Sequence, residues 1–128
     1  MKNKSIFSKE APAAAGPYSH AVQTGPFYYL SGQLGVDPQT NALADGAEAQ
    51  ARQALENLQS VLASAGLTMD DVVKTTVFLK NIGDFAAINI IYAEAFGENK
   101  PARSCVAVAE LPRGGLFEIE AVAYMANA

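Results

Sequence analysis

Apolar residues recur at steps of three and four across residues 47–65, with polar side chains between them. This spacing puts the apolar groups along one side of a helix, and Gly66 stands where glycine commonly ends one. The same spacing recurs over residues 85–96, with Asp84 as the predicted N-terminal cap and Gly97 at the end. The pattern therefore predicts two amphipathic helices.

Five other segments carry patterns typical of β-strands, rich in β-branched and aromatic residues. They are residues 20–24, 27–35, 72–79, 103–109 and 117–125. The turn dipeptide Gly25-Pro26 joins the first two segments into a predicted hairpin. The sequence LPRGG joins the last two, and we expect these to form a second hairpin centred near Arg113.

The order strand-strand-helix-strand-helix-strand-strand predicts an α+β fold, with one sheet and two helices on one of its faces. We expect one domain over residues 1–128. Two helices leave the other face of the sheet uncovered, and its strands carry apolar residues such as Val106, Val122 and Tyr124. Such a face favours self-assembly. The alternative is an ordinary amphipathic sheet with its mixed face in water.

Composition excludes several classes of protein. The formal net charge is −4 and the basic residues are scattered, which argues against nucleic acid as a partner. One cysteine excludes an internal disulfide, and one histidine excludes a His/Cys metal cluster of ordinary spacing. The N-terminus lacks the apolar stretch of a secretory signal, and no apolar run reaches the ~20 residues that span a membrane. We expect a soluble, cytoplasmic protein without a membrane partner.

Charged side chains inside the last two predicted strands are the first candidates for chemistry. The planar guanidinium of Arg103 suits a carboxylate ligand, and a salt bridge to Glu118 or Glu120 explains it equally well. The two glutamates alternate onto one face of the last strand. A carboxyl group beside apolar groups has a raised pKa and can act as a general acid, whereas solvated edge-strand glutamates are the commoner case.

Cys105 and His20 are the only cysteine and the only histidine in the chain. A cysteine nucleophile needs a base, usually histidine, and these two residues lie in different parts of the sequence. We therefore interpret Cys105 as a small buried hydrophobic residue and His20 as a loop or strand-edge residue. Tyr18, Ser31 and Asn89 are further side chains able to hydrogen-bond a small ligand.

Several segments together resemble a known family. They are APAAAGPYSHAV, LSGQLGVDPQT, QARQALENLQSVLASAGLTMDDVVKTTVFL, DFAAINIIYAEAF and PARSCVAVAELP with the later FEIEAVA. From Ala11 to Ala123 the chain resembles the reactive-intermediate deaminase (RidA, or YjgF) family. The PARS block and the later Glu-Ile-Glu-Ala sequence are the most specific parts, and Phe117 stands where an aliphatic residue is more usual.

The resemblance implies a chorismate-mutase-like domain with a mixed, mainly antiparallel sheet, assembled as a homotrimer with clefts between subunits. It also implies hydrolysis of reactive 2-imino and 2-enamino acids, such as 2-iminobutyrate and 2-aminoacrylate, to 2-oxo acids and ammonia. This is metabolite damage control by a 2-iminobutanoate/2-iminopropanoate deaminase, a hydrolase of C=N bonds. Neither a cofactor nor a metal is implied.

By position, the resemblance makes Arg103 the residue that grips the substrate carboxylate and Glu118 the residue that positions water and exchanges protons. The remaining pocket positions are Tyr18, Ser31, Gly32, Asn89 and Cys105, the last through its backbone N–H. Three alternatives stay open. They are a non-catalytic trimer that binds 2-oxo acids or acts as a holdase, an RNA-cleaving enzyme that the net charge disfavours, and a deaminase of a larger substrate such as aminomuconate.

The expected hairpin separates Arg103 from Glu118. Around a turn at Arg113, Arg103 would lie opposite Ala123 and Glu118 opposite Val108, five residues or ~16 Å along the strands. An imino acid of three or four carbons is too short to touch both groups. We therefore predict that two copies of the chain, packed through the uncovered sheet face, build each site.

Overall fold

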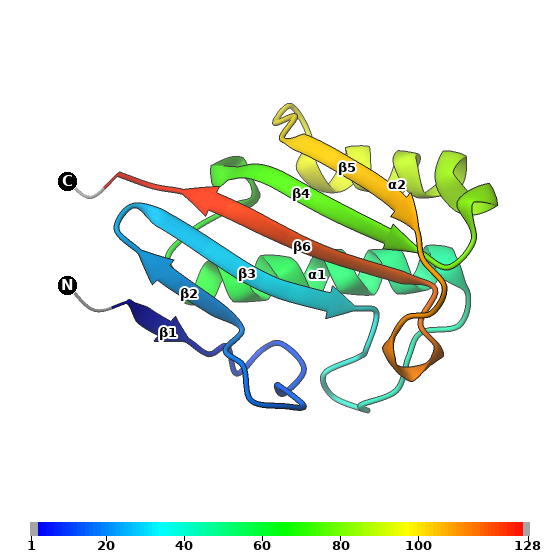
Figure 1. Cartoon of the computed structure of the whole chain (residues 1–128), viewed down its shortest axis with the longest axis horizontal. Coiled ribbons are helices and arrows are strands. Elements are labelled where there is room, and N and C mark those ends of the chain that lie inside the picture. The colour runs from blue at the N-terminus through cyan, green and yellow to red at the C-terminus, as the bar shows by residue number, and fades with distance from the viewer. Residues whose placement is uncertain (1–2, 127–128) are drawn as a thin grey trace.

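The computed structural model describes residues 3–126 as one sheet and a layer of helices (Figure 1). The strands are β1 (Lys4–Ile6), β2 (Ala21–Thr24), β3 (Phe27–Leu34), β4 (Val72–Leu79), β5 (Ala102–Ala107) and β6 (Phe117–Tyr124). The helices are α1 (Ala47–Ser64) and α2 (Phe85–Phe96), with short 3-10 turns η1 (Met69–Asp71), η2 (Ile82–Asp84) and η3 (Pro112–Gly114).

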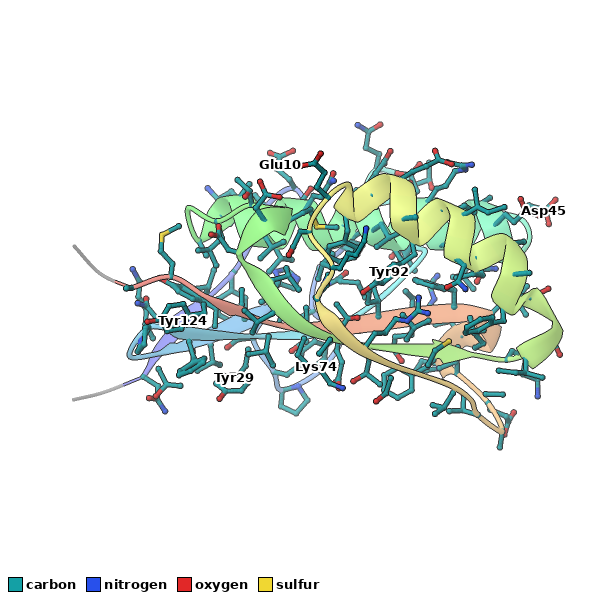
Figure 2. All side chains as sticks on the ribbon, turned by 90° about the horizontal axis from the view of Figure 1, so that it is seen from above. Glu10, Tyr29, Asp45, Lys74, Tyr92 and Tyr124 are labelled. Carbon is teal, nitrogen blue, oxygen red and sulfur yellow. The ribbon has the colours of Figure 1, made fainter. Side chains whose placement is uncertain are left out.

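The six strands lie in the order β1-β2-β3-β6-β4-β5. Only the β4–β5 pair is parallel, and the other neighbours are antiparallel. Both long helices pack against the same face of the sheet, as Figures 1 and 2 show. The predicted α+β fold, a mixed and mainly antiparallel sheet with two helices on one face, is confirmed.

The helix predictions are accurate because their signals are local. Gly66 and Gly97 follow α1 and α2 with φ of 78° and 62°, a region that glycine adopts without steric cost. Asp84 occupies the N-cap position of α2, but its side chain makes no capping hydrogen bond. Asp84 therefore stands at the predicted position, but the prediction that its side chain caps the helix is wrong. Residue 84 is the last residue of η2 and already has near-helical φ and ψ of −81° and −3°.

Two expectations about the strands are wrong. The first predicted strand begins at residue 20, but β1 precedes it. This strand is only three residues long and forms by pairing with β2, so its own sequence did not predict it. The last two strands do not form a hairpin, because β4 lies between them, antiparallel to β6 and parallel to β5. The connection wraps around the end of β4, where Val108 N–H donates to the Leu79 carbonyl and Lys80 N–H donates to that of Leu116.

Buried amide side chains on α1 hold the loops next to β3 and β6. Asn57 is 1% exposed, and its Nδ2 donates to the carbonyls of Leu34 and Val36 at 3.1 and 2.9 Å. Gln50 accepts a hydrogen bond from Leu116 N–H at 2.8 Å. Because buried carbonyl and N–H groups are costly to leave unpaired, these amides fix the backbone of both loops.

The sheet face opposite the helices carries large exposed apolar side chains. Tyr29 is 49% exposed and Tyr124 is 44% exposed, with Phe27 and Val106 exposed to a similar extent. Figure 2 shows Tyr29 and Lys74 projecting from this side, away from both helices. We call it the open face. Within residues 3–126 no helix combines the length and the apolar character that a membrane span requires.

Candidate active site

The predicted site residues fall into two groups on opposite faces of the sheet. Strand β4 lies between β5 and β6. Its residue Thr75 pairs with Arg103 of β5, and its residue Phe78 pairs with Glu118 of β6. Cross-strand partners point to the same face, and residues three apart along a strand point to opposite faces. Arg103 therefore lies on the helix side and Glu118 on the open face.

The separation of the two charged groups is larger than one small acid can span. Thr75 pairs with Arg103 on β5 and with Ala121 on β6, so Arg103 is aligned with Ala121. The expected hairpin register, which aligned Arg103 with Ala123, is therefore wrong. Glu118 is then two strands away and three residues along, which amounts to roughly 14 Å between Cα atoms. Because the sheet itself lies between the side chains, one chain cannot bring them to a single ligand.

Glu118 belongs to a pocket of about 190 Å³ at one end of the sheet. Three of the predicted residues line it, namely Tyr18, Gly32 and Glu118. Its other walls are largely apolar and come from Pro12, Ala13, Ala15, Leu34, Val36 and Pro112, with His20, Gln33, Asn41 and Arg113 also present. An apolar pocket with a few convergent polar groups is the usual form of a small-ligand site.

The Glu118 carboxyl group rests on the backbone of β3 at Gly32. A Cβ atom built at Gly32 would lie only 2.5 Å from Glu118 Oε2, so glycine alone leaves room for the carboxyl group here. The strand is irregular at this point, between Leu30 and Gln33. Burial, and next the nearby charge of Glu120, raise the pKa of Glu118. A carboxyl group in this setting exchanges protons nearer to neutral pH than a solvated one.

The loop before β2 forms one wall of this pocket, and His20 holds it. His20 is 3% exposed, its Nδ1 accepts from Ser8 N–H at 2.9 Å, and its Nε2 donates to the Pro12 carbonyl at 2.7 Å. The expectation of a plain loop or strand-edge histidine therefore missed a buried structural role. Ser31 Oγ donates to the Ser19 carbonyl at 2.7 Å, so this hydroxyl ties the loop to β3 rather than lining the pocket.

Arg113 is a pocket residue that sequence reasoning treated only as part of a turn. Its Nη2 donates to the Asn41 carbonyl at 2.7 Å, and both residues have positive φ, 61° for Arg113 and 60° for Asn41. This contact joins the loop before β6 to the loop after β3 and closes one end of the pocket. Local sequence held no signal for it, because the two residues are 72 positions apart.

The second group surrounds Arg103 beneath α2. The guanidinium carbon of Arg103 lies 4.7 Å from the centre of the Tyr92 ring and 5.5 Å from that of Phe85. Asn89 lies between these two residues along α2, and its helical spacing puts it on the same side. Cys105 follows Arg103 at an interval of two on β5 and therefore faces the same way.

The alternative explanation of Arg103, a salt bridge to Glu118 or Glu120, does not hold in one chain. Within residues 3–126 the only ion pair is Arg52–Glu94 at 3.8 Å. Arg103 instead lies over the Tyr92 and Phe85 rings, and within residues 3–126 its guanidinium forms no salt bridge.

Cys105 and His20 do not meet in one chain. Strands β3, β6 and β4 lie between β2, which follows His20, and β5, which carries Cys105. Four strand spacings amount to roughly 19 Å. Burial raises the pKa of the Cys105 thiol, although Arg103 lowers it in part, so the thiol form is favoured. This separation argues against a Cys105–His20 catalytic pair, while Cys105 is only partly buried and not the buried hydrophobic residue that we expected.

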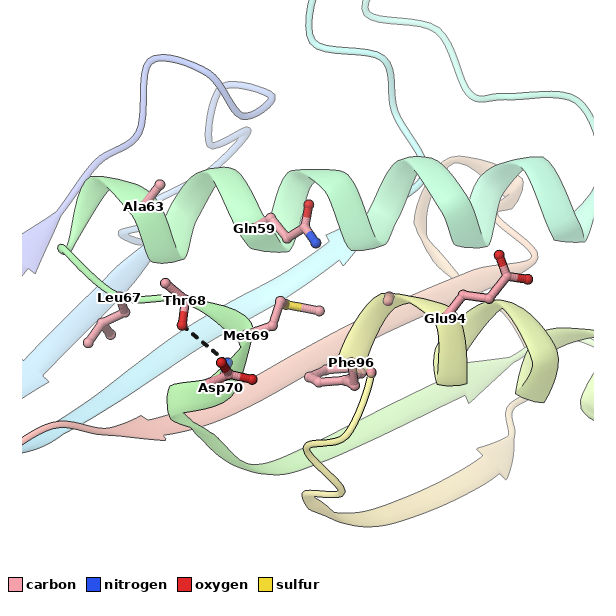
Figure 3. Close-up of a pocket in the computed structure, with 10 residues that line it drawn as sticks. Gln59, Ala63, Leu67, Thr68, Met69, Asp70, Glu94 and Phe96 are labelled. Carbon is pink, nitrogen blue, oxygen red and sulfur yellow. Dashed lines mark hydrogen bonds between the residues drawn. The ribbon is translucent and has the colours of Figure 1, made fainter.

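A larger hollow of about 410 Å³ lies elsewhere, between the last turns of α1 and α2 (Figure 3). None of the predicted site residues lines it, and its charged side chains are Asp70 and Glu94. These carboxylates would repel an anionic substrate. We therefore place the candidate site at the groups around Glu118 and Arg103.

In the described part of the chain, no cluster of three or more His, Cys, Asp or Glu side chains has the arrangement of a metal site.

Fold and site together define a class of small α+β proteins with candidate ligand groups on both faces of one sheet. The family described as Endoribonuclease L-PSP matches residues 8–125. The chain belongs to this family, which is also the RidA/YjgF family, and the resemblance found in the sequence is thereby confirmed.

Curated relatives cover nearly the whole chain. A 2-iminobutanoate/2-iminopropanoate deaminase of Salmonella typhimurium is 49% identical over 124 residues, which is 94% of this chain and 97% of the relative. A RutC family protein of Pyrococcus horikoshii is 48% identical over 120 residues, with coverages of 93% and 95%. Some relatives thus carry the name of the deaminase, and others carry only that of a family.

Solved structures of relatives have the same fold. The yjgF gene product of Escherichia coli superposes with a TM-score of 0.91 at 45% identity, covering 94% of this chain and 98% of that one. Escherichia coli TdcF with bound serine gives a TM-score of 0.92 at 42% identity, covering 96% and 99%.

Proposed function

We propose that this chain is a hydrolytic deaminase of small 2-imino acids and their enamine tautomers. The observation that carries the proposal is that one group of residues offers a guanidinium and the other offers a carboxyl group of raised pKa. Within residues 3–126 Arg103 offers a guanidinium without a carboxylate partner, and Glu118 is a carboxyl group of raised pKa in a largely apolar pocket. One group suits a carboxylate, and the other suits proton exchange with water.

The complete site lies between copies of the chain, which we propose assemble as a homotrimer through their open faces. Exposed Tyr29, Tyr124 and Val106 supply apolar surface for such a contact. Packing this face on a neighbour would bring one chain's Glu118 to the Arg103 edge of the next. A repeated head-to-tail contact of this kind closes into a ring when the rotation from one copy to the next divides a full turn evenly. The number of copies is taken from the family resemblance, and the need for a second copy comes from the geometry.

The reaction proceeds in two steps once Arg103 holds the substrate carboxylate by a bidentate pair and so fixes the position of C2. In the first step, water adds to C2 of the protonated imine, the C=N electron pair moves to nitrogen, and Glu118 takes the proton released by water. In the second step, Glu118 returns this proton to nitrogen, the C–N bond breaks, and ammonia leaves. Transfer of the hydroxyl proton to the departing ammonia gives the 2-oxo acid, so one protonated imino acid and one water yield one oxo acid and one ammonium ion.

The relatives support the choice of substrate class. The Salmonella typhimurium relative is named for imines of three and four carbons, and the TdcF structure contains serine, a small amino acid with the same carboxylate. The pocket of about 190 Å³ beside Glu118 fits a side chain of this size.

The decisive experiment generates 2-iminobutyrate with a threonine dehydratase in the presence of semicarbazide. We expect the protein to suppress semicarbazone formation from the imine and to speed the appearance of 2-oxobutyrate. If purified protein changes neither rate but binds 2-oxobutyrate, the chain is a small-acid binding protein instead. Cleavage of a structured RNA by the same preparation would favour the endoribonuclease activity after which the family is named.

We expect Gly32→Ala to lower kcat for 2-iminobutyrate by at least about tenfold, because the added methyl group displaces the Glu118 carboxyl group from the pocket. The matched control is Gly83→Ala, where a Cβ atom meets nothing within 4 Å. Steady-state kinetics of both variants, with circular dichroism to verify folding, test the expectation. An unchanged kcat in a folded Gly32→Ala protein would show that Glu118 tolerates movement and contradict its assigned role.

A further inference from the structure

Within residues 3–126, Arg103 lies over aromatic rings and forms no salt bridge with a carboxylate. The guanidinium carbon lies 4.7 Å from the Tyr92 ring centre and 5.5 Å from the Phe85 ring centre, both on α2. Stacking on an aromatic ring uses the flat face of a guanidinium, and the N–H groups that bind a carboxylate lie along its edge. A guanidinium that lies over a ring can therefore still bind a carboxylate through its N–H groups.

The Tyr92 ring is itself held in place from the sheet. Its hydroxyl group makes a 2.7 Å hydrogen bond with Thr75 Oγ1, and Thr75 is fully buried. Figure 2 shows Tyr92 between α2 and the sheet. On the next turn of α2, the Phe96 ring lies 4.6 Å from that of Tyr92 and limits its movement. Burial raises the pKa of Tyr92, although Thr75 and Arg103 lower it in part, which keeps the hydroxyl group protonated.

Thr75 and Arg103 are direct partners in the β4–β5 register. The hydrogen bond from Thr75 to Tyr92 therefore ties the ring to the backbone pair that carries Arg103. Strand, ring and guanidinium form one connected unit: Thr75 is hydrogen-bonded to Tyr92, and the Tyr92 ring lies beside the guanidinium of Arg103. A guanidinium left free at an edge strand would sample several rotamers and lose entropy on binding each substrate.

We propose that Tyr92, anchored by Thr75, is a positioning residue that sets the guanidinium of Arg103 for bidentate binding of the substrate carboxylate. This inference rests on the proposed function and names the support that its carboxylate group requires. The ring does not touch the reacting atoms and acts only through Arg103.

The test measures binding of 2-oxobutyrate by calorimetry together with turnover of 2-iminobutyrate. We expect Tyr92→Leu, which removes the ring, to raise the Kd about 5–30-fold, the range of a partly desolvated cation–π contact. Tyr92→Phe and Thr75→Val each break the same hydrogen bond, so each should raise the Kd by a smaller and similar factor. The double variant should be no weaker than either single one.

A positioning role for Tyr92 is distinguished from a general effect on folding by measuring the same Tyr92 substitution with and without Arg103. In an Arg103→Ala background, Tyr92→Phe should leave the residual Kd unchanged, because the ring then has no guanidinium to orient. The matched control Tyr28→Phe changes a buried tyrosine on β3, three strands from β5, and should leave the Kd unaltered with Arg103 present.

Two results would overturn the inference. One is an equal effect of Tyr92→Phe with and without Arg103, and the other is a wild-type protein that binds no 2-oxobutyrate. Should the coupling appear while 2-iminobutyrate is not hydrolysed, the positioning role stands and the proposed deaminase fails. Conversely, hydrolysis without the coupling leaves the deaminase intact and removes Tyr92 from this role.

Discussion

A mixture of Arg103→Ala and Glu118→Gln chains should recover activity that neither variant has alone. In a ring where each site takes Arg103 from one chain and Glu118 from the next, a random equimolar mixture makes about one quarter of its sites intact. The variants are co-refolded, subunit exchange is verified by native mass spectrometry, and 2-iminobutyrate turnover is measured per mole of chain. We expect about 25% of the wild-type rate.

The matched control mixes wild-type chains with the double variant Arg103→Ala/Glu118→Gln. A site shared between copies then leaves about one quarter of the sites intact, whereas a site inside one chain leaves about one half. Absence of recovery in the first mixture, with half activity in the second, would place both residues in one chain and remove the shared-site model.

Glu118→Gln should abolish turnover and yet stabilise the protein at neutral pH. An amide cannot exchange protons, so we expect kcat to fall about 10²–10⁴-fold. The pKa of Glu118 in the folded chain is raised above its ordinary value of 4.5, first by burial and then by Glu120. The folded state therefore favours the protonated form and loses stability as pH rises from about 4.5 through the raised pKa.

The neutral amide avoids this loss. Thermal unfolding should give Glu118→Gln a Tm a few degrees above wild type at pH 8, a gain that vanishes at pH 3.5, where the wild-type carboxyl group is also neutral. Glu120→Gln is the control: it leaves the proton-exchanging group in place and removes a like charge. Its pH–rate profile should therefore have its acidic limb at lower pH than wild type. A Tm difference that is the same at both pH values would show that burial of charge at residue 118 is not its cause.

Local signals account for the elements that the sequence predicted well. The ends of α2 and β4 match the predicted ranges, because turn glycines, apolar spacing and runs of β-branched residues act within a few positions. The alternation of Glu118 and Glu120 onto one face follows in the same way from the period of a strand. The family resemblance added roles for Arg103 and Glu118, which the mutations above test.

Contacts between distant segments account for what the sequence missed. Local pattern favoured a hairpin of the last two strands, but β4 offers both of them a partner, and this insertion moves Arg103 and Glu118 one strand further apart. The Arg113–Asn41 contact joins two loops, and the His20–Pro12 contact closes the single loop before β2, where no periodic pattern signals it. Strand pairing is non-local, so its choice depends on the packing of the whole sheet.

The sequence by itself determined the helices, most of the strands, the covered and open faces, and the residue types that a small-acid site needs. It did so because periodicity and side-chain chemistry are properties of short segments. Only the tertiary structure decided that Arg103 rests on Tyr92, that Glu118 lies over Gly32, and that the two groups are divided by the sheet. Those facts depend on strand order and register. Hydrogen bonds between segments far apart in the chain determine both.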